Sequence, residues 1–146
     1  MSVNELQGLT QKFADAFDQR DLQPVMEMLS EDVEVFDHVP YRFDGKPLFA
    51  KYLHEAVAGL VSASFGFRQP SCRMFSDEVG IVNAHDMFTG VTKDGKVLSI
   101  HGRTTLVFIK QSGQWKIVSA HFSAIPKASE NRARAYGRLE VHHDYQ

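Results

Sequence analysis

The feature that most constrains this chain is a pair of turn signals between three long runs of alternating polar and apolar residues. The runs span about 79–91, 96–110 and 114–125, and residues 94–95 (Asp-Gly) and 112–113 (Ser-Gly) separate them. Asp-Gly between alternating runs is a strong hairpin signal, and Ser-Gly is a weaker one. The pattern therefore predicts three consecutive strands of one antiparallel sheet.

Helical and shorter extended segments precede these strands. Apolar residues recur at helical spacing near the N-terminus and again after Pro47, a residue that suits a helix start. The expected elements are a helix over 4–18, a short helix over 21–29, a strand over 33–36, a loop over 37–45, a helix over 47–60 and a strand over 65–75. This order predicts an α+β fold in which a cone-shaped, curved antiparallel sheet wraps around helices.

The chain reads as one domain. Its 146 residues match the usual size of a single domain, with no repeat or linker, so we expect the domain to span residues 1–126. Residues 127–146 are polar and are expected to form a tail or a short helix.

Composition excludes several classes of function. The formal net charge is -2 and the sequence pI is about 6.4, which argues against nucleic acid or an anionic membrane as a partner. No apolar run approaches the ~20 residues of a membrane span, and the start lacks the features of a secretory signal. Cys72 is the single cysteine and cannot form an internal disulfide. We therefore expect a cytoplasmic location, and no motif calls for a cofactor.

The sheet register predicts a ligand site. If both turns contain two residues, Asp86 faces Arg103 and Arg103 faces Phe122, on the side toward the helices. An acid, a base and an aromatic ring on an apolar wall are typical of a small-molecule site. The eleven phenylalanines of the chain fit such a wall. The ligand-binding residues predicted in this way are Arg103, Asp86, Phe122, Tyr41, Phe49, Tyr52, Val57 and Thr105.

Asp86 and Arg103 allow two interpretations. As a buried ion pair they would only fix the strand register. As the floor of a pocket they would favour a neutral or weakly acidic ligand, because the carboxylate cancels part of the guanidinium charge. The guanidinium would also lower the pKa of Asp86 and make it a weak base. The candidate catalytic residues are Asp86 and His101, with Tyr41 as a further group that could take the proton.

The opposite face of the sheet predicts self-association. It is too apolar for a free surface and too polar for a core, which is typical of an interface between two copies of the chain. His85 and His121 lack an acidic third ligand, so the interface is favoured over a metal site. The residues assigned to this homodimer interface are His85, Thr104, His121, Trp115 and Leu106.

Four sequence blocks together carry a resemblance to a known family. They are residues 29–33 (LSEDV), 43–46 (FDGK), 102–105 (GRTT) and 113–123 (GQWKIVSAHFS). With the element order, they resemble the SnoaL-like group of the nuclear-transport-factor-2-like (NTF2-like) superfamily. Within this superfamily, the sequence most resembles the association domain of calcium/calmodulin-dependent kinase II and its bacterial relatives. The resemblance covers about residues 5–126.

The resemblance implies a cone-shaped α+β barrel of the cystatin-like kind, homodimers through the sheet, and a pocket between sheet and helices. In the association domains that pocket holds several arginines, and Arg103 matches one of them. Asp86 and Phe122 stand where two others would be. Other members of the superfamily include isomerases of the ketosteroid isomerase type and dehydratases, and many have no known activity, so the fold leaves function open.

Three functions therefore remain as hypotheses. The first is a pocket that binds an unidentified small molecule without chemistry. The second is an enzyme of the ketosteroid isomerase or dehydratase type, in which Asp86 or His101 transfers a proton. The third is an oligomerisation module with a vestigial pocket.

Overall fold

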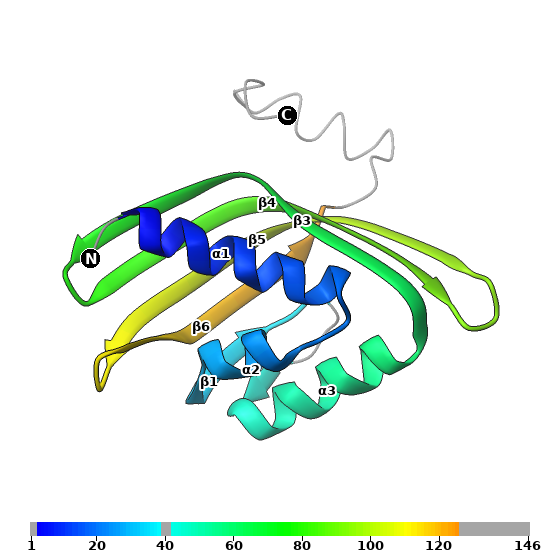
Figure 1. Ribbon diagram of the computed structural model, residues 1–146, viewed down its shortest axis with the longest axis horizontal. Coiled ribbons are helices and arrows are strands. Elements are labelled where there is room, and N and C mark those ends of the chain that lie inside the picture. Colours follow the sequence, from blue (N-terminus) through cyan, green and yellow to red (C-terminus); the bar gives the residue numbers. More distant parts are fainter. Residues whose placement is uncertain (1–2, 39–41, 126–146) are drawn as a thin grey trace, which may run out of the picture.

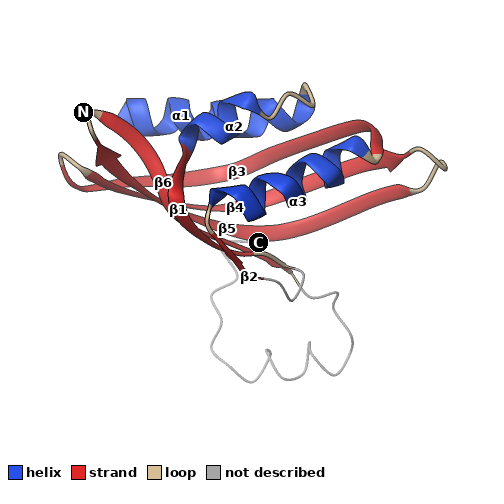
Figure 2. Cartoon of the chain, turned by 90° about the horizontal axis from the view of Figure 1, so that it is seen from below, coloured by secondary structure: helices blue, strands red, loops and turns tan. Residues whose placement is uncertain are grey.

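The computed structural model describes residues 3–38 and 42–125, which form a six-stranded sheet curving around three helices (Figures 1 and 2). This confirms the α+β class and the curved sheet. The expected tail over 127–146 lies outside the described residues. In chain order the elements are α1 (Val3–Asp18), α2 (Gln23–Met28), β1 (Leu29–Phe36), β2 (Arg42–Asp44), α3 (Lys46–Ala58), β3 (Leu60–Ser76), β4 (Val79–Thr92), β5 (Val97–Gln111) and β6 (Gln114–Ala124).

The sheet is mixed and open, whereas the sequence predicted an antiparallel one in the shape of a cone. Its strand order is β2-β1-β6-β5-β4-β3, and β1 runs parallel to β6. β1 follows α2 without a loop. It joins the antiparallel β3–β6 sheet at its β6 edge and runs in the same direction as β6. The short strand β2 was expected to be loop. It pairs antiparallel with β1, from Phe36 opposite Arg42 to Glu34 opposite Asp44.

The two long hairpins use different turns. Ser112 and Gly113 both have positive φ, at 50° and 78°, as a two-residue type I′ turn requires, so the prediction for this turn is confirmed. At the other turn only Gly95 has positive φ, at 86°. The Thr92 amide donates to the Lys96 carbonyl over 2.9 Å, so the loop contains three residues, 93–95. The two-residue turn predicted there is wrong.

One extra residue in that loop shifts the whole β4–β5 register. Asp86 lies opposite Gly102, and His85 lies opposite Arg103, so the predicted pairing of Asp86 with Arg103 is wrong. An irregularity between Val107 and Phe108 adds a second one-residue shift between β5 and β6. The two shifts cancel for β6, which keeps Phe122 on the predicted face. The opposite set of side chains is presented by β5 and by the first part of β6, where Trp115 and Ile117 face the core.

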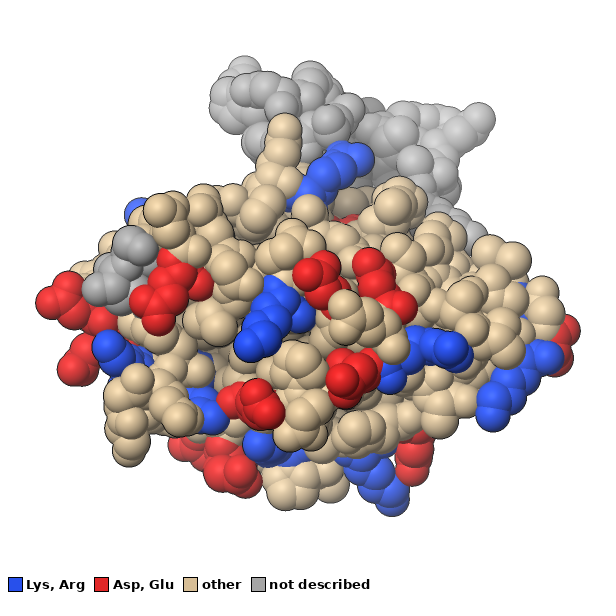
Figure 3. All heavy atoms as spheres, viewed as in Figure 1, with Lys and Arg blue, Asp and Glu red and all other residues tan. Residues whose placement is uncertain are grey.

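All three helices lie on the same side of the sheet, which is called the inner face below (Figure 2). Phe13 of α1 and Phe49 of α3 are each 2% exposed, and Leu106 and Phe108 of β5 are fully buried in the same hydrophobic core. The side with the helices carries acidic and basic side chains interspersed (Figure 3). Within the described residues, no helix is long and apolar enough to cross a membrane.

Candidate functional site

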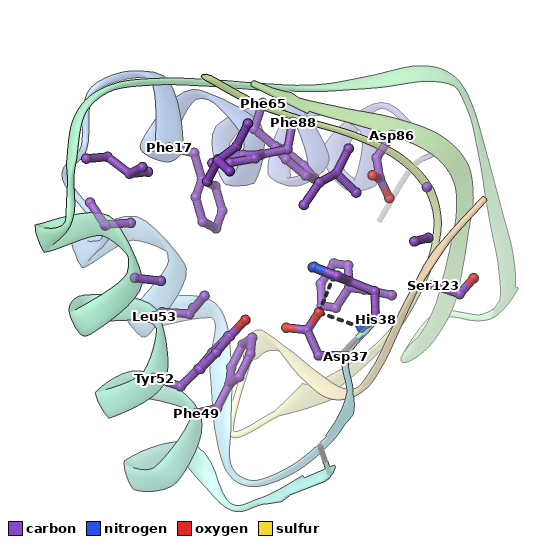
Figure 4. Close-up of a pocket in the computed structure, with 18 of the residues that line it drawn as sticks. Phe17, Asp37, His38, Phe49, Tyr52, Leu53, Phe65, Asp86, Phe88 and Ser123 are labelled. Carbon is purple, nitrogen blue, oxygen red and sulfur yellow. Dashed lines mark hydrogen bonds and ion pairs between the residues drawn. The ribbon is translucent and has the colours of Figure 1, made fainter. Parts of the chain in front are cut away.

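A cavity of about 290 Å³ lies between the inner face of the sheet and the helices (Figure 4). Aromatic rings form much of its wall, and they come from α1, α3 and three of the strands. Polar side chains are few, and Asp37, His38 and Asp86 carry the carboxyl and imidazole groups among them. The aromatic residues that line it are Phe13, Phe17, Phe49, Tyr52, Phe65, Phe88 and Phe122.

Asp86 enters the cavity from β4 and is held there by its neighbours on β5. The Thr104 hydroxyl donates a hydrogen bond to Asp86 Oδ2, and Thr104 itself is 2% exposed. A Cβ at Gly102 would lie 2.9 Å from Asp86 Oδ1, so the glycine leaves the space that the carboxylate occupies. Burial raises the pKa of the Asp86 carboxyl above its ordinary value, while the bond from Thr104 and the nearby His38 oppose the shift. Asp86 is therefore a stronger base than an exposed aspartate.

Asp37 and His38 form an acid–histidine pair at the end of β1. His38 Nδ1 lies 2.5 Å from Asp37 Oδ1, and the same oxygen accepts the backbone N–H of His38 over 2.6 Å. The hydrogen bond to Asp37 raises the pKa of the His38 imidazole above 6.5, and the charge of Asp86 adds to the effect. This arrangement fixes the ring and favours its protonated form. His38 Nε2 has no partner among the described residues.

Strand topology explains why these groups meet. β1 runs parallel to β6 with Phe36 beside His121, so the residues after Phe36 continue alongside the end of β6. β6 pairs with β5, where Gly102 lies opposite Ala124, and Gly102 in turn lies opposite Asp86. The parallel pairing thus carries His38 to the same end of the sheet as Asp86. The close-up shows both side chains at the cavity (Figure 4).

Five predicted ligand-binding residues line this cavity. They are Asp86, Phe122, Phe49, Tyr52 and Val57. Their lining position follows from the structure, while their contact with a ligand stays a prediction. Tyr41 lies outside the described residues.

Three predicted site residues do not reach the cavity. Arg103 and His101 are exposed on the outer face of β5, and Thr105 bonds there to Asn83 over 2.6 Å. The cause is the three-residue loop, which exchanges the faces of β5 and places Gly102 and Thr104 inward. The predicted floor of Asp86 and Arg103 is therefore wrong.

The exchange on β5, together with the irregularity between β5 and β6, corrects the expected homodimer surface. Thr104, Leu106 and Trp115 are buried in the core of the described chain, at 2%, 0% and 8% exposure. They are not available to a second copy. His85 and His121 do lie on the outer face, so dimerisation through that face stays a prediction with a different set of residues.

Sequence reasoning missed Asp37 and His38, because Tyr41 is the residue that the loop predicted over 37–45 contributes to the expected site. One signal was available: an acid directly followed by a histidine, at the end of a strand. Without the parallel pairing of β1 with β6, however, the sequence does not place this pair near Asp86. Within the described residues, no group of three His, Cys, Asp or Glu side chains could hold a metal ion.

A helix-filled curved sheet with a cavity at one end is the architecture of NTF2-like and cystatin-like folds. The chain belongs to the SnoaL-like domain family, whose model matches residues 6–127. The family resemblance noted in the sequence is thereby confirmed. No curated protein matches the chain significantly.

Solved structures with low sequence identity share the fold. A proposed calcium/calmodulin-dependent protein kinase II association domain from Xanthomonas campestris is 19% identical over 88% of this chain and 91% of its own, with a TM-score of 0.76. A proposed scytalone dehydratase from Novosphingobium aromaticivorans is 14% identical over 84% of this chain and 83% of its own, with a TM-score of 0.77. An NTF2-like superfamily protein from Salmonella enterica is 17% identical over 96% of each chain, with a TM-score of 0.75.

Proposed function

We propose that the inner cavity binds a compact, uncharged ring ketone and that Asp86 and His38 move a proton on it. One observation carries the proposal: a partly buried carboxyl and a carboxylate-paired imidazole line the same aromatic cavity and influence each other electrostatically. Two titratable groups with shifted pKa values in one cleft are a frequent sign of acid–base chemistry.

The cavity suits such a ligand. Its volume of about 290 Å³ is close to the lower end for small-molecule sites, and its wall is mostly aromatic. Phe13 and Phe122 stack with their ring centroids 6.3 Å apart, which gives the wall flat surfaces. A flat ring compound would bury apolar area against these rings and place one polar atom among Asp37, His38 and Asp86.

The two groups would take complementary roles. Burial raises the pKa of Asp86, so its carboxylate is a better base for a C–H proton beside a carbonyl. Asp37 raises the pKa of His38, so its imidazolium stays available near neutral pH as an acid. As Asp86 removes the proton, the electron pair moves toward the carbonyl oxygen, and His38 Nε2–H donates to that oxygen.

Two reactions would complete the cycle. In an isomerisation Asp86 returns the proton to a different carbon. In a dehydration a β-hydroxyl leaves and takes a proton from His38, which yields water and the unsaturated ketone. Two of the similar structures are proposed dehydratases, at 14% and 13% identity, which agrees with the second reaction. The identity of the substrate is not needed to test the shared first step.

Exchange of α-hydrogens tests that first step directly. We expect the wild-type chain to accelerate deuterium incorporation from D₂O into 2-tetralone, followed by proton NMR. Asp86→Asn and His38→Gln should each lower the exchange rate about 10²–10⁴-fold, the usual contribution of a general acid or base. His101→Gln is the matched control, because it removes a histidine of the outer face and should leave the rate unchanged.

The pH profile is a second readout. Exchange requires ionised Asp86 and protonated His38, so the rate should rise above the pKa of Asp86 and fall above that of His38. The pKa values of Asp86 and His38, which set these two limits, lie above their ordinary values of 3.8 and 6.5. Saturable binding of 2-tetralone without exchange at any pH would reduce the function to binding alone, and absence of binding to any ring ketone would refute the proposal.

A further inference from the structure

The outer face of the sheet carries a second hollow, on the opposite side from the helices, with a volume of about 550 Å³. Two rows of paired residues cross it. The first row places Arg68 of β3, His85 of β4 and Arg103 of β5 side by side. The second row places Gly66, Met87 and His101 side by side. Four basic or protonatable side chains thus surround one depression.

No acidic side chain on these strands balances the arginines. Strands β3, β4, β5 and β6 contain a single Asp or Glu, which is Asp86. Asp86 also borders the hollow, but its carboxylate accepts the hydrogen bond of Thr104 on the inner face. Neither Arg68 nor Arg103 forms an ion pair with a described residue. Two guanidinium groups with unused donors are therefore exposed around the hollow.

The same hollow has an apolar part. Met87 and Ile125 line it, and they stay 48% and 42% exposed. Gly66 adds no side chain, and a Cβ built there would meet no atom within 4 Å. A ligand that fits both parts has an apolar body and one negatively charged head.

We infer that the outer hollow binds a small aromatic or alicyclic carboxylate. Its ring lies over Gly66 and against Met87 and Ile125. Its carboxylate lies over His85 and accepts hydrogen bonds from Arg68 and Arg103. Neighbouring strands are about 4.8 Å apart, so two long arginine side chains that flank one histidine can converge on a single carboxylate. This site is separate from the inner cavity and does not depend on the chemistry proposed there.

Isothermal titration calorimetry with 2-naphthoate tests the inference, with 2-naphthylmethanol as the uncharged analogue. The wild-type chain should bind naphthoate and should bind the alcohol about tenfold more weakly or not at all. Arg68→Gln and Arg103→Gln should each weaken naphthoate about five- to tenfold, in the range of one solvent-exposed, charge-assisted hydrogen bond. Raising the ionic strength should weaken binding further, because exposed charges are screened.

Three further variants locate the binding. Gly66→Leu should abolish naphthoate binding, because the side chain projects into the hollow without a clash in the sheet. Arg73→Gln should have no effect, since Arg73 is an exposed arginine of the same strand whose guanidinium lies over the Phe75 ring, 4.8 Å from its centroid. His38→Gln should also have no effect, which separates this site from the inner cavity.

Several results would overturn the inference. They are equal affinities for naphthoate and the alcohol, equal losses from Arg73→Gln and Arg68→Gln, or a loss caused by His38→Gln. A second copy of the chain could occupy the hollow instead. In that case sedimentation would show a dimer that Gly66→Leu dissociates, and naphthoate would not bind to the wild-type chain.

Discussion

The two faces of the sheet differ in chemistry although adjacent residues of the same strands form them. On the inner face Asp86 lies in an aromatic cavity with His38, and on the outer face His85 and Arg103 lie in an open hollow. Because side chains alternate along a strand, a shift of one residue exchanges these sets. The contrast teaches that a single loop residue at the β4–β5 turn decides which side chains of β5 face the inner cavity and which face the outer hollow.

The largest expected effect compares two neighbours on β5. Leu106 is fully buried, and Thr105 lies on the outer face with its hydroxyl bonded to Asn83. Leu106→Ala should lower the free energy of unfolding by about 2–5 kcal/mol, because it leaves a cavity in the core. Thr105→Ala should change it by about 0.5 kcal/mol or less. Urea denaturation measures the free energy of unfolding of both variants. A larger loss for Thr105→Ala than for Leu106→Ala would instead support the register expected from a two-residue turn.

Two glycines provide the second comparison. A Cβ at Gly102 would lie 2.7 Å from the Ser123 carbonyl oxygen and 2.9 Å from the Asp86 carboxylate, whereas one at Gly66 meets nothing. Gly102→Ala should therefore destabilise the fold by about 1–3 kcal/mol and displace Asp86. Gly66→Ala should stabilise it by up to about 1 kcal/mol, since a strand interior disfavours glycine. Thermal unfolding measures the stability of both variants. Equal changes in stability from the two substitutions would contradict the inner-face packing.

The third comparison concerns the hydroxyl that holds Asp86. Thr104→Val keeps the shape of the side chain and removes the hydrogen bond to the carboxylate, which should cost about 1 kcal/mol at neutral pH. Thr105→Val removes an exposed hydroxyl on the other face and should cost less than about 0.5 kcal/mol. Thr104→Val should also raise the pKa of Asp86, because the lost bond lowers it in the wild-type chain. Carboxyl chemical shifts in an NMR titration would report that change, and an unchanged titration of Asp86 would argue against the bond.

How much of this the sequence could predict differs between the fold and the site. The element order apart from β2, the inner position of Asp86 and Phe122 and the Ser112-Gly113 turn follow from alternation and turn chemistry, which are local. The turn at residues 93–95 does not, because Asp94-Gly95 suits either a two-residue or a three-residue loop. In the structure the Lys96 amide also donates to the Thr92 hydroxyl over 2.9 Å, which supports the longer loop.

The position of Asp37 and His38 beside Asp86 could not be predicted from the sequence, for a different reason. Asp37 and His38 approach Asp86 only because β1 adds to the sheet in parallel beside β6, a pairing between residues more than eighty positions apart. Local patterns carry no information on such a pairing. The error at β5 and the omission of His38 therefore have separate causes, a turn type in one case and a long-range strand pairing in the other.

The smallest expected effect is the pH dependence of stability that Asp86 causes. Burial raises its pKa in the folded chain above 3.8, so the folded state holds the proton more tightly than the unfolded state. This carboxyl therefore favours folding below pH 3.8, and the advantage is lost as the pH rises through the folded pKa. Asp86→Asn should accordingly gain stability relative to wild type as the pH rises from about 3 to about 7.

A matched variant on the outer face separates this effect from overall charge. Arg103→Gln also changes the net charge by one unit, but the guanidinium keeps its proton over this range, so its stability difference from wild type should stay nearly constant with pH. Denaturant titrations of both variants at several pH values give the two curves. A difference for Asp86→Asn that is flat or falls with pH would mean that hydrogen bonding outweighs burial at Asp86. Its carboxylate would then be no stronger a base than an exposed one, and the proposed proton transfer would lose its base.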